Sequence, residues 1–365
     1  MRVLIAGGGT GGHLYPGIAL ARAFQGMGVT DILFVGTARG IESEVLQKEG
    51  FPLAKIHVSG IMNKGLFKTI TSILLLPIGL IDSIKILLSF RPDVVVGIGG
   101  YTSGPIVAMA MLLRIKRVIL EPNLIPGITN RLLAPAANRI AVAFEETKRY
   151  FRGSQVVMTG NPVREEIICI DNTLWSPLAG TEAFPYTLFV FGGSQGAHSI
   201  NVAMVDALDY IKDLKDKIFI IHQTGRPDFS NIMESYRNKG FKARVEPYIF
   251  DIARIYRLAD LIISRAGATT VAEIMACGRP AILIPFPYST HGHQEKNAMA
   301  LKEAGAAEVI DGPSLNGRLL GETIMRLLSD REGLRLMGNR SRSLGRRDAA
   351  RKIALICNRL AGGEI

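Results

Sequence analysis

The residues best suited to chemistry lie between Ser264 and Glu273, where the sequence reads SRAGATTVAE. The apolar run before them predicts a short buried strand, Gly267 predicts a turn, and the following residues predict a helix. The first N–H groups of a helix have no partners within it, so such a start suits an anion. Arg265 could accompany the phosphates of a nucleoside diphosphate, and Glu273 could accept hydrogen bonds from the hydroxyls of a ribose.

Glycine-rich turns follow apolar runs elsewhere in the chain. They are Gly7–Gly12, Gly99–Gly104 and Gly192–Gly196, and Glu121 and Asn123 follow a further apolar run. Ligands of open α/β sheets bind at the carboxyl ends of the strands. We therefore expect three of these segments, Gly7–Gly12, Gly99–Gly104 and Glu121–Asn123, to converge at one edge of the first sheet.

The elements that must position these residues alternate between strands and helices. Buried runs such as Val3–Ala6 predict a parallel sheet, and their order predicts a doubly wound α/β fold. The strand, glycine turn and helix that begin near Thr187 repeat the pattern at the start of the chain. We therefore expect two Rossmann-like domains that face each other across a cleft, the first over residues 1–162 and the second over residues 163–340. The tail from Leu320 to Leu360 is expected to be helical, with breaks near Gly338 and Gly345.

The segment from Lys64 to Arg91 is apolar with scattered lysines. Its longest uncharged run, Thr69–Ile81, is too short to span a bilayer, which needs about 20 residues. Pro77 and Gly79 are expected to divide the segment into two helices. The pattern fits buried helices that cover the sheet, and it also fits an interfacial helix on anionic lipid. We therefore expect one part of the segment to lie in the core and another part to bind the membrane surface.

Composition limits the class of partner. The 365 residues suffice for two domains, and the net charge of +11 indicates an anionic partner: a nucleotide, a nucleic acid or an acidic membrane surface. Nucleic acid is disfavoured, because recognition motifs and interleaved aromatic residues are absent from the sequence. The three cysteines are far apart, as in a reducing compartment. The sequence opens directly into a predicted strand, so we expect a protein in the cytosol or on the cytosolic side of a membrane.

Several kinds of nucleotide chemistry are disfavoured by the motifs. The first glycine turn lacks the GK[ST] ending of an NTP-hydrolysing loop. Thr37 and Arg39 stand where an acidic residue would hold the ribose of NAD, which makes NAD a weak candidate. The sequence has no zinc-type cluster and no DxD carboxylate pair. We expect a two-substrate transferase without metal or cofactor, in which helix starts and arginine stabilise a departing diphosphate.

Six motifs of the chain resemble, in order, those of the MurG family: GGGTGGH, GGYTSGP, GNPVR, GGSQGA, SRAGATTVAE and HQEKNA. The resemblance covers nearly the whole chain and implies the GT-B fold. It implies inverting transfer of GlcNAc from UDP-GlcNAc to the muramoyl 4-hydroxyl of lipid I, which forms lipid II for peptidoglycan. It also implies a peripheral protein at the cytoplasmic face of the bacterial inner membrane, on anionic lipid and near other proteins of cell-wall synthesis.

The resemblance implies two sets of substrate-binding residues. Those expected at the donor sugar and the acceptor diphosphate are Thr10, Gly11, Gly12, Asn123 and Gln294. Those expected at UDP are Arg164, Ser194, Ile249, Arg265, Ala268, Thr269, Thr270, Val271, Ala272 and Glu273. Within the second set, Ile249 would hold uracil through its backbone and Glu273 would bind the ribose.

The resemblance also implies the roles of the domains. The first domain would bind the acceptor and the membrane, and the second would bind UDP-GlcNAc. The tail helix, at about residues 341–365, would cross back to the first domain. The chain departs from the family at Pro122, where other members often have glutamine, and at His293, where some do. Pro122 lacks an N–H donor, which bears on the placement of Asn123.

The general base that deprotonates the acceptor hydroxyl is expected to be His13. It lies at a helix start in the expected site, its pKa range suits proton transfer near neutral pH, and a positive helix end would keep it neutral. Glu121 is the alternative base. His198, His222 and His291 are expected to be structural or surface residues.

Other classes of function stay open. A UDP-GlcNAc 2-epimerase or a natural-product glycosyltransferase would share the fold, although the basic apolar segment favours a lipid-linked acceptor. A non-catalytic scaffold for cell-wall or division proteins would bind UDP-GlcNAc without turnover. A dehydrogenase is the third alternative, and failure to bind NAD would exclude it.

Overall fold

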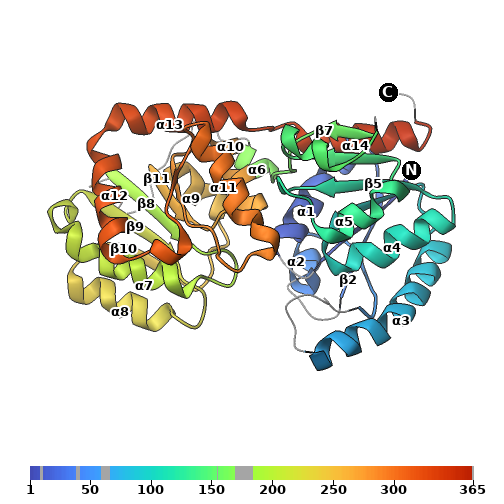
Figure 1. Cartoon of the computed structure of the whole chain (residues 1–365), viewed down its shortest axis with the longest axis horizontal. Helices are drawn as coiled ribbons and strands as arrows, with labels where there is room; N and C mark the ends of the chain where they lie inside the picture. Colours follow the sequence, from blue (N-terminus) through green and yellow to red (C-terminus); the bar gives the residue numbers. More distant parts are fainter. Residues whose placement is uncertain (9–10, 38–41, 59–65, 154, 169–183, 364–365) are drawn as a thin grey trace. The chain divides into compact units, whose positions relative to one another are not determined.

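The computed structural model describes residues 1–8, 11–37, 42–58, 66–153, 155–168 and 184–363, with the backbone alone for residues 66–74 and Thr290. The chain forms two compact units (Figure 1). Unit 1 consists of Met1–Arg164 and Arg346–Ile365, and unit 2 consists of Glu165–Gly345. Each unit is built around one parallel β-sheet with helices on both faces.

The sheet of unit 1 has seven strands in the described residues, in the order β3-β2-β1-β4-β5-β6-β7. They are β1 (Arg2–Gly7), β2 (Asp31–Gly36), β3 (Leu53–Lys55), β4 (Val94–Gly99), β5 (Lys116–Glu121), β6 (Arg139–Val142) and β7 (Val156–Met158). Along β1, Val3 and Ile5 lie in one core, whereas Leu4 and Ala6 lie in another on the opposite face. Because both faces are buried, the strand reads as a continuous apolar run.

The helices of unit 1 include one that comes from the end of the chain. They are α1 (Gly11–Gly26), α2 (Glu42–Lys48), α3 (Leu66–Phe90), α4 (Gly100–Leu112), α5 (Ile128–Leu133) and α14 (Ala349–Leu360), with short 3-10 helices at Ala134–Ala136 and Glu145–Tyr150. Residues Ile353, Ala354 and Cys357 of α14 share a core with Leu14 and Ile18 of α1. The last helix is therefore an integral part of unit 1.

The sheet of unit 2 has six strands in the described residues, in the order β10-β9-β8-β11-β12-β13. They are β8 (Tyr186–Phe191), β9 (Ile218–Gln223), β10 (Ala243–Glu246), β11 (Leu261–Ser264), β12 (Ala281–Leu283) and β13 (Glu308–Val309). On one face, Leu188 and Val190 share a core with residues of helices α7, α8 and α12. On the other face, Phe189 and Phe191 contact Tyr256 of α9.

Five of the helices of unit 2 in the described residues, α7 to α11, connect successive strands, as in a doubly wound sheet. The helices of this unit are α6 (Glu165–Ile168), α7 (His198–Ala207), α8 (Phe229–Lys239), α9 (Ile252–Leu258), α10 (Ala268–Cys277), α11 (His293–Glu303), α12 (Gly317–Ser329) and α13 (Arg331–Leu344). Short 3-10 helices lie at Leu208–Tyr210, Lys212–Leu214, Thr290–Gly292 and Gly312–Ser314.

Each sheet has one point where the strand order reverses. In unit 1 this switch point lies between β1 and β4, and in unit 2 it lies between β8 and β11. Gly7 is paired with Gly99 at the first switch point. The loops that begin at Gly192 and Arg265 follow the two strands of the second. The predicted convergence of glycine turns is thus confirmed in unit 1, and unit 2 has the same arrangement, at the position where doubly wound sheets bind ligands.

The predicted division of the Lys64–Arg91 segment into two helices is wrong. A single helix, α3, runs from Leu66 to Phe90 with Pro77 inside it. A proline removes one backbone hydrogen bond, which a long helix can tolerate. Gly79 serves close packing, because a Cβ there would lie 2.4 Å from Val58 Cγ1. Among the described residues, no helix is both long enough and apolar enough to cross a membrane.

The predicted break near Gly338 is also wrong, whereas the one near Gly345 is confirmed. The tail breaks at Asp330, between α12 and α13, and again after Leu344. Gly338 lies inside α13, where a Cβ would stand 2.9 Å from the carbonyl oxygen of Gly278. This glycine lets α13 approach α10 closely and does not end the helix.

Candidate active site

His13 lies in the first turn of α1, against the start of α4. A Cβ on Gly99 would stand 3.3 Å from His13 Nε2, and a Cβ on Gly100 would stand 3.4 Å from Nδ1. Both glycines have positive φ, 104° and 75°, which favours glycine. The imidazole therefore packs against the backbone of these two glycines at the switch point of unit 1. Burial lowers the pKa of His13, so the ring is neutral near pH 7 and can accept a proton.

Glu121 ends β5, and both of its carboxylate oxygens accept hydrogen bonds. Oε1 accepts from the backbone N–H of Asn123 at 2.9 Å and from its Nδ2 at 3.2 Å. Oε2 accepts from the N–H of Gly127 at 2.9 Å and from Asn130 Nδ2 at 2.8 Å. Burial raises the pKa of this carboxyl group, and the four bonds oppose the rise. Glu121 thus holds the loop after β5, and it fixes Asn123 in place despite Pro122.

The other predicted residues of unit 1 gather around the first turns of α1. Gly11 and Gly12 begin this helix. The guanidinium of Arg164 lies over the ring of Tyr15, 4.3 Å from its centroid, in a cation–π contact. Thr10 lies outside the described residues.

The start of α10 lies at the switch point of unit 2. Its N-cap residue is Gly267, with φ −63° and ψ 144°, which has no side chain to cap the helix start. Ala268, Thr269 and Thr270 are partly exposed there, whereas Val271 and Ala272 are buried and anchor the helix. The first turn can therefore receive an anion through its backbone N–H groups.

Glu273 is buried one turn further along α10. Its Oε2 accepts a hydrogen bond from the hydroxyl of Tyr256 at 2.9 Å. A buried carboxylate is costly unless it is hydrogen-bonded. The helix start and this carboxylate together offer an anion site beside an acceptor for hydroxyl groups.

Arg265 braces the same site. Its Nη1 donates to the carbonyl oxygens of Ile284 and Pro285, each at 3.1 Å, and its Nη2 donates to Ser199 Oγ at 2.7 Å. The guanidinium therefore joins the end of β12 to the start of α7. It brings a fixed positive charge to the switch point through these contacts.

Gln223, which ends β9, is a site residue that the sequence analysis missed. It is buried, its Nε2 donates to the carbonyl oxygen of Gly193 at 2.9 Å, and its Oε1 accepts from the N–H of Ile249 at 2.8 Å. It thus connects Ile249 to the loop of residues 192–197, which contains the partly exposed Ser194 and is called the Ser194 loop below. Because this N–H is engaged, a backbone contact from Ile249 to a ligand would use its carbonyl oxygen. A glutamine at the end of an apolar strand was the available signal.

Gln294 lies in the first turn of α11 and is held by the preceding loop. Its Oε1 accepts from the N–H of Phe286 at 2.9 Å, and its own N–H donates to Ser289 Oγ at 3.4 Å. The neighbouring His293 has its pKa lowered to about 4, mainly by burial and secondly by His291. Gln294 is therefore held at the carboxyl end of the sheet by its contacts with Phe286 and Ser289.

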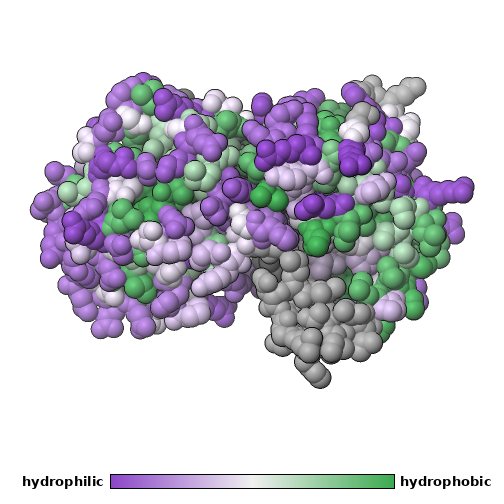
Figure 2. Space-filling view, in the orientation of Figure 1, coloured by the Kyte–Doolittle hydropathy of each residue, from purple (hydrophilic) through white to green (hydrophobic). Residues whose placement is uncertain are grey.

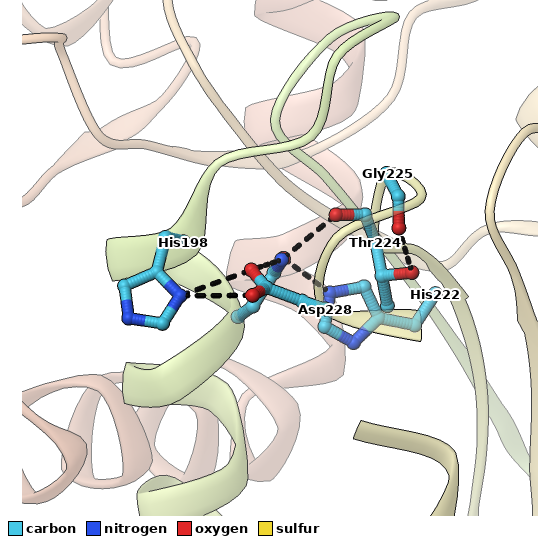
Figure 3. A network of polar contacts seen from close by, with 6 residues as sticks. His198, His222, Thr224, Gly225 and Asp228 are labelled. Atoms are coloured by element: carbon cyan, nitrogen blue, oxygen red, sulfur yellow. Dashed lines mark hydrogen bonds and ion pairs between the residues drawn. The ribbon is translucent and has the colours of Figure 1, made fainter. Parts of the chain in front are cut away.

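Polar side chains of α7, β9 and the segment before α8 form a network (Figure 3). Asn201 Nδ2 donates to Asp228 Oδ2 at 2.7 Å, so Asn201 Oδ1 is left to accept from His222 Nε2 at 3.0 Å. His222 Nδ1 then accepts from the hydroxyl of Tyr236 at 2.9 Å. Exposed His198 Nδ1 contacts Asp228 at 3.0 Å. His222 is thus fully buried, whereas His198 and His291 are exposed, which agrees with their interpretation as structural or surface residues.

The network predicts acid sensitivity of unit 2. Burial lowers the pKa of His222 to about 3. In the unfolded chain, His222 has its ordinary pKa of about 6.5 and is protonated below that pH. In the folded chain it stays neutral down to about pH 3. The free energy of unfolding should therefore decrease as the pH falls from about 6.5 towards about 3, by about 1.4 kcal/mol per pH unit. Urea unfolding of His222→Gln across this range should show a shallower pH dependence, and exposed His291→Gln is the control. Equal slopes in wild type and His222→Gln would contradict a buried neutral His222.

Comparison with known proteins adds to this geometry. Residues 3–142 match the Glycosyltransferase family 28 N-terminal domain, and residues 187–353 match the Glycosyltransferase family 28 C-terminal domain. A relative from Myxococcus xanthus is 44% identical over 98% of this chain and 92% of its own length. One from Geobacter sulfurreducens is 44% identical over 97% of each chain. Both are named UDP-N-acetylglucosamine--N-acetylmuramyl-(pentapeptide) pyrophosphoryl-undecaprenol N-acetylglucosamine transferase.

The solved structures agree with these relatives. The crystal structure of Acinetobacter baumannii MurG has a TM-score of 0.76 and 28% identity, and covers 98% of this chain and 99% of that one. The chain belongs to the MurG family.

Membership of the MurG family agrees with the fold. The predicted pair of Rossmann-like domains, the GT-B class, is confirmed by the two parallel sheets and by this structural neighbour. A UDP-GlcNAc 2-epimerase from Neisseria meningitidis bound to UDP-GlcNAc has a TM-score of 0.68 at 15% identity, and covers 98% of this chain and 100% of that one. That likeness shows the fold alone, so it does not favour the epimerase alternative.

Proposed function

We propose that the chain transfers GlcNAc from UDP-GlcNAc to the 4-hydroxyl of MurNAc in lipid I, forming lipid II for peptidoglycan. The names of its MurG relatives support this donor and acceptor. The observation that carries the proposal is the start of α10, with glycine as its N-cap residue, beside the buried carboxylate of Glu273. An anion site next to an acceptor for hydroxyls matches the diphosphate and the ribose of the donor.

Unit 2 binds the donor in this proposal. The diphosphate lies at the start of α10 and the Ser194 loop, and the ribose hydroxyls donate to Glu273. The carbonyl oxygen of Ile249 accepts from uracil, and Gln294 contacts the GlcNAc hydroxyls. Helix dipoles and fixed cations stabilise the charge that develops on the departing UDP, so no metal is needed.

Unit 1 binds the acceptor and supplies the base. His13 takes the proton of the muramoyl 4-hydroxyl while the oxygen attacks C1 of GlcNAc. The bond from C1 to the UDP oxygen breaks, the electron pair leaves with UDP, and the configuration at C1 inverts. Four hydrogen bonds occupy the carboxylate of Glu121, which favours His13 as the base. Glu121 instead positions Asn123.

An apolar surface on α3 and α4 supports docking of unit 1 to the cytoplasmic face of the inner membrane. Ile81 and Leu88 are 52% and 55% exposed, and exposed Lys85 lies between them on the same face of α3. Figure 2 shows apolar side chains gathered over these helices. Exposed Met111 and Leu112 extend the surface at the end of α4. Apolar residues interspersed with lysine suit the headgroup region of anionic lipid.

Charged residues in this surface should weaken membrane binding. The double variant Ile81→Glu with Leu88→Glu is expected to lower partitioning onto vesicles that contain phosphatidylglycerol by about tenfold or more, because two apolar side chains no longer enter the lipid. Co-sedimentation with these vesicles and with neutral ones measures the effect. Leu336→Glu is the matched control, because Leu336 is 41% exposed on α13 of unit 2. An equal loss in this control would contradict docking through α3.

The proposed function is tested with radiolabelled UDP-GlcNAc and a short-chain lipid I analogue. Transfer of label to the lipid-linked product is the expected result. Conversion of UDP-GlcNAc to its 2-epimer would support an epimerase, and transfer to soluble acceptors alone would support a natural-product enzyme. Tight binding of UDP-GlcNAc without any product would support a scaffold.

A further inference from the structure

Tyr256 joins the core of unit 2 to the candidate ribose site. It lies in α9 and is fully buried, and its hydroxyl donates to Glu273 Oε2 at 2.9 Å. Its ring meets Phe189 and Phe191 edge-on, at centroid distances of 5.8 Å and 6.1 Å. Those two rings stack on each other at 4.5 Å along β8. The hydroxyl is therefore held by side chains of the central strand.

The bond to Glu273 has one possible direction. A carboxylate only accepts hydrogen bonds, so the phenol must be the donor. The two groups come from different helices, α9 and α10, and only the folded sheet brings them together. An unanchored glutamate samples several rotamers and loses that freedom when it binds a ligand. Because the phenol fixes one carboxylate oxygen before the ligand binds, the glutamate loses less conformational entropy on binding.

We propose that Tyr256 is the positioning residue for ribose recognition. Its hydroxyl holds the carboxylate of Glu273 in the orientation that accepts hydrogen bonds from the ribose hydroxyls of the donor. This inference rests on the proposed function, in which Glu273 binds the ribose. Tyr256 and Glu273 together would then cause the chain to bind ribonucleotides more tightly than deoxynucleotides.

The phenol acts on the ribose, which is remote from the reacting carbon. Loss of the hydroxyl should therefore raise KM for UDP-GlcNAc and leave kcat near the wild-type value. A residue that only stabilised the fold would change the affinity for every nucleotide equally. Discrimination between ribose and dideoxyribose therefore distinguishes a positioning role of Tyr256 from a purely structural one.

The test measures Kd for UDP and for 2′,3′-dideoxy-UDP by calorimetry with the full chain. Tyr256→Phe retains the ring and its packing, and it is expected to raise Kd for UDP about tenfold, as for the loss of a hydrogen bond to a charged group. Kd for the dideoxy nucleotide should change little, so the preference for ribose should fall by about the same factor. Tyr236→Phe is the matched control, because Tyr236 is a buried tyrosine of the same unit whose hydroxyl bonds to His222. It should keep the wild-type preference.

An unchanged ribose preference in Tyr256→Phe, including an equal loss of affinity for both nucleotides, would overturn the inference. Wild type that binds UDP without any ribose preference would also overturn it. Wild type that does not bind UDP would instead contradict the proposed function. Glu273→Gln gives a second measurement, because Tyr256→Phe should have no further effect on the preference in that background.

Discussion

Replacing His13 with alanine should lower kcat for lipid I glycosylation at least about a hundredfold, the range of a general base. The affinity for UDP should change little, because His13 lies in unit 1 and the proposed UDP ligands Ser194, Ile249 and Glu273 lie in unit 2. Steady-state transfer and UDP calorimetry on the same variant measure the two effects. His291→Ala, in an exposed position, is the control.

The pH profile gives a second check on the same residue. Burial lowers the pKa of His13 below its ordinary value, so the neutral base persists to lower pH. The rate should therefore be flat near pH 7, and its acid limb should lie below about 6.5. A near-wild-type kcat in His13→Ala would remove this residue from the mechanism. An acid limb above that value would contradict a lowered pKa for His13.

Replacing Glu273 with glutamine should raise KM for UDP-GlcNAc about thirtyfold or more and change kcat much less. Each hydrogen bond to a charged acceptor contributes about 1.5–3 kcal/mol, and the neutral amide weakens those of both ribose hydroxyls. Donor-dependence curves at saturating acceptor measure the change. Glu322→Gln is the control, since Glu322 lies on the surface of α12 and pairs with Arg318. An unchanged KM in Glu273→Gln would place the ribose elsewhere.

Much of the fold follows from patterns that are local in the sequence. Apolar runs and glycine turns predict the strands and their carboxyl ends, and the repeated pattern near Thr187 predicts the second sheet. The switch points then bring Gly7 beside Gly99, and the loop after Phe191 beside Arg265. Local pattern was sufficient here because both sheets are parallel and buried on both faces.

The errors lie where tertiary contacts override local propensity. Gly79 and Gly338 suggest helix breaks, but each sits where another segment approaches too closely for a Cβ. The contributions of Gln223 and Tyr256 depend on contacts between elements distant in the sequence. Spacing alone therefore did not indicate these two residues, although it did predict Glu273, and the family resemblance implied Gln294.

The central claim is that helix starts and fixed side chains, without a cation, take up the charge as UDP departs. The most direct test is the initial rate of transfer from UDP-GlcNAc to a lipid I analogue, measured with and without EDTA. Equal rates in the two reactions are the expected result. A rate that falls to background in EDTA and returns when a divalent cation is added would contradict the central claim.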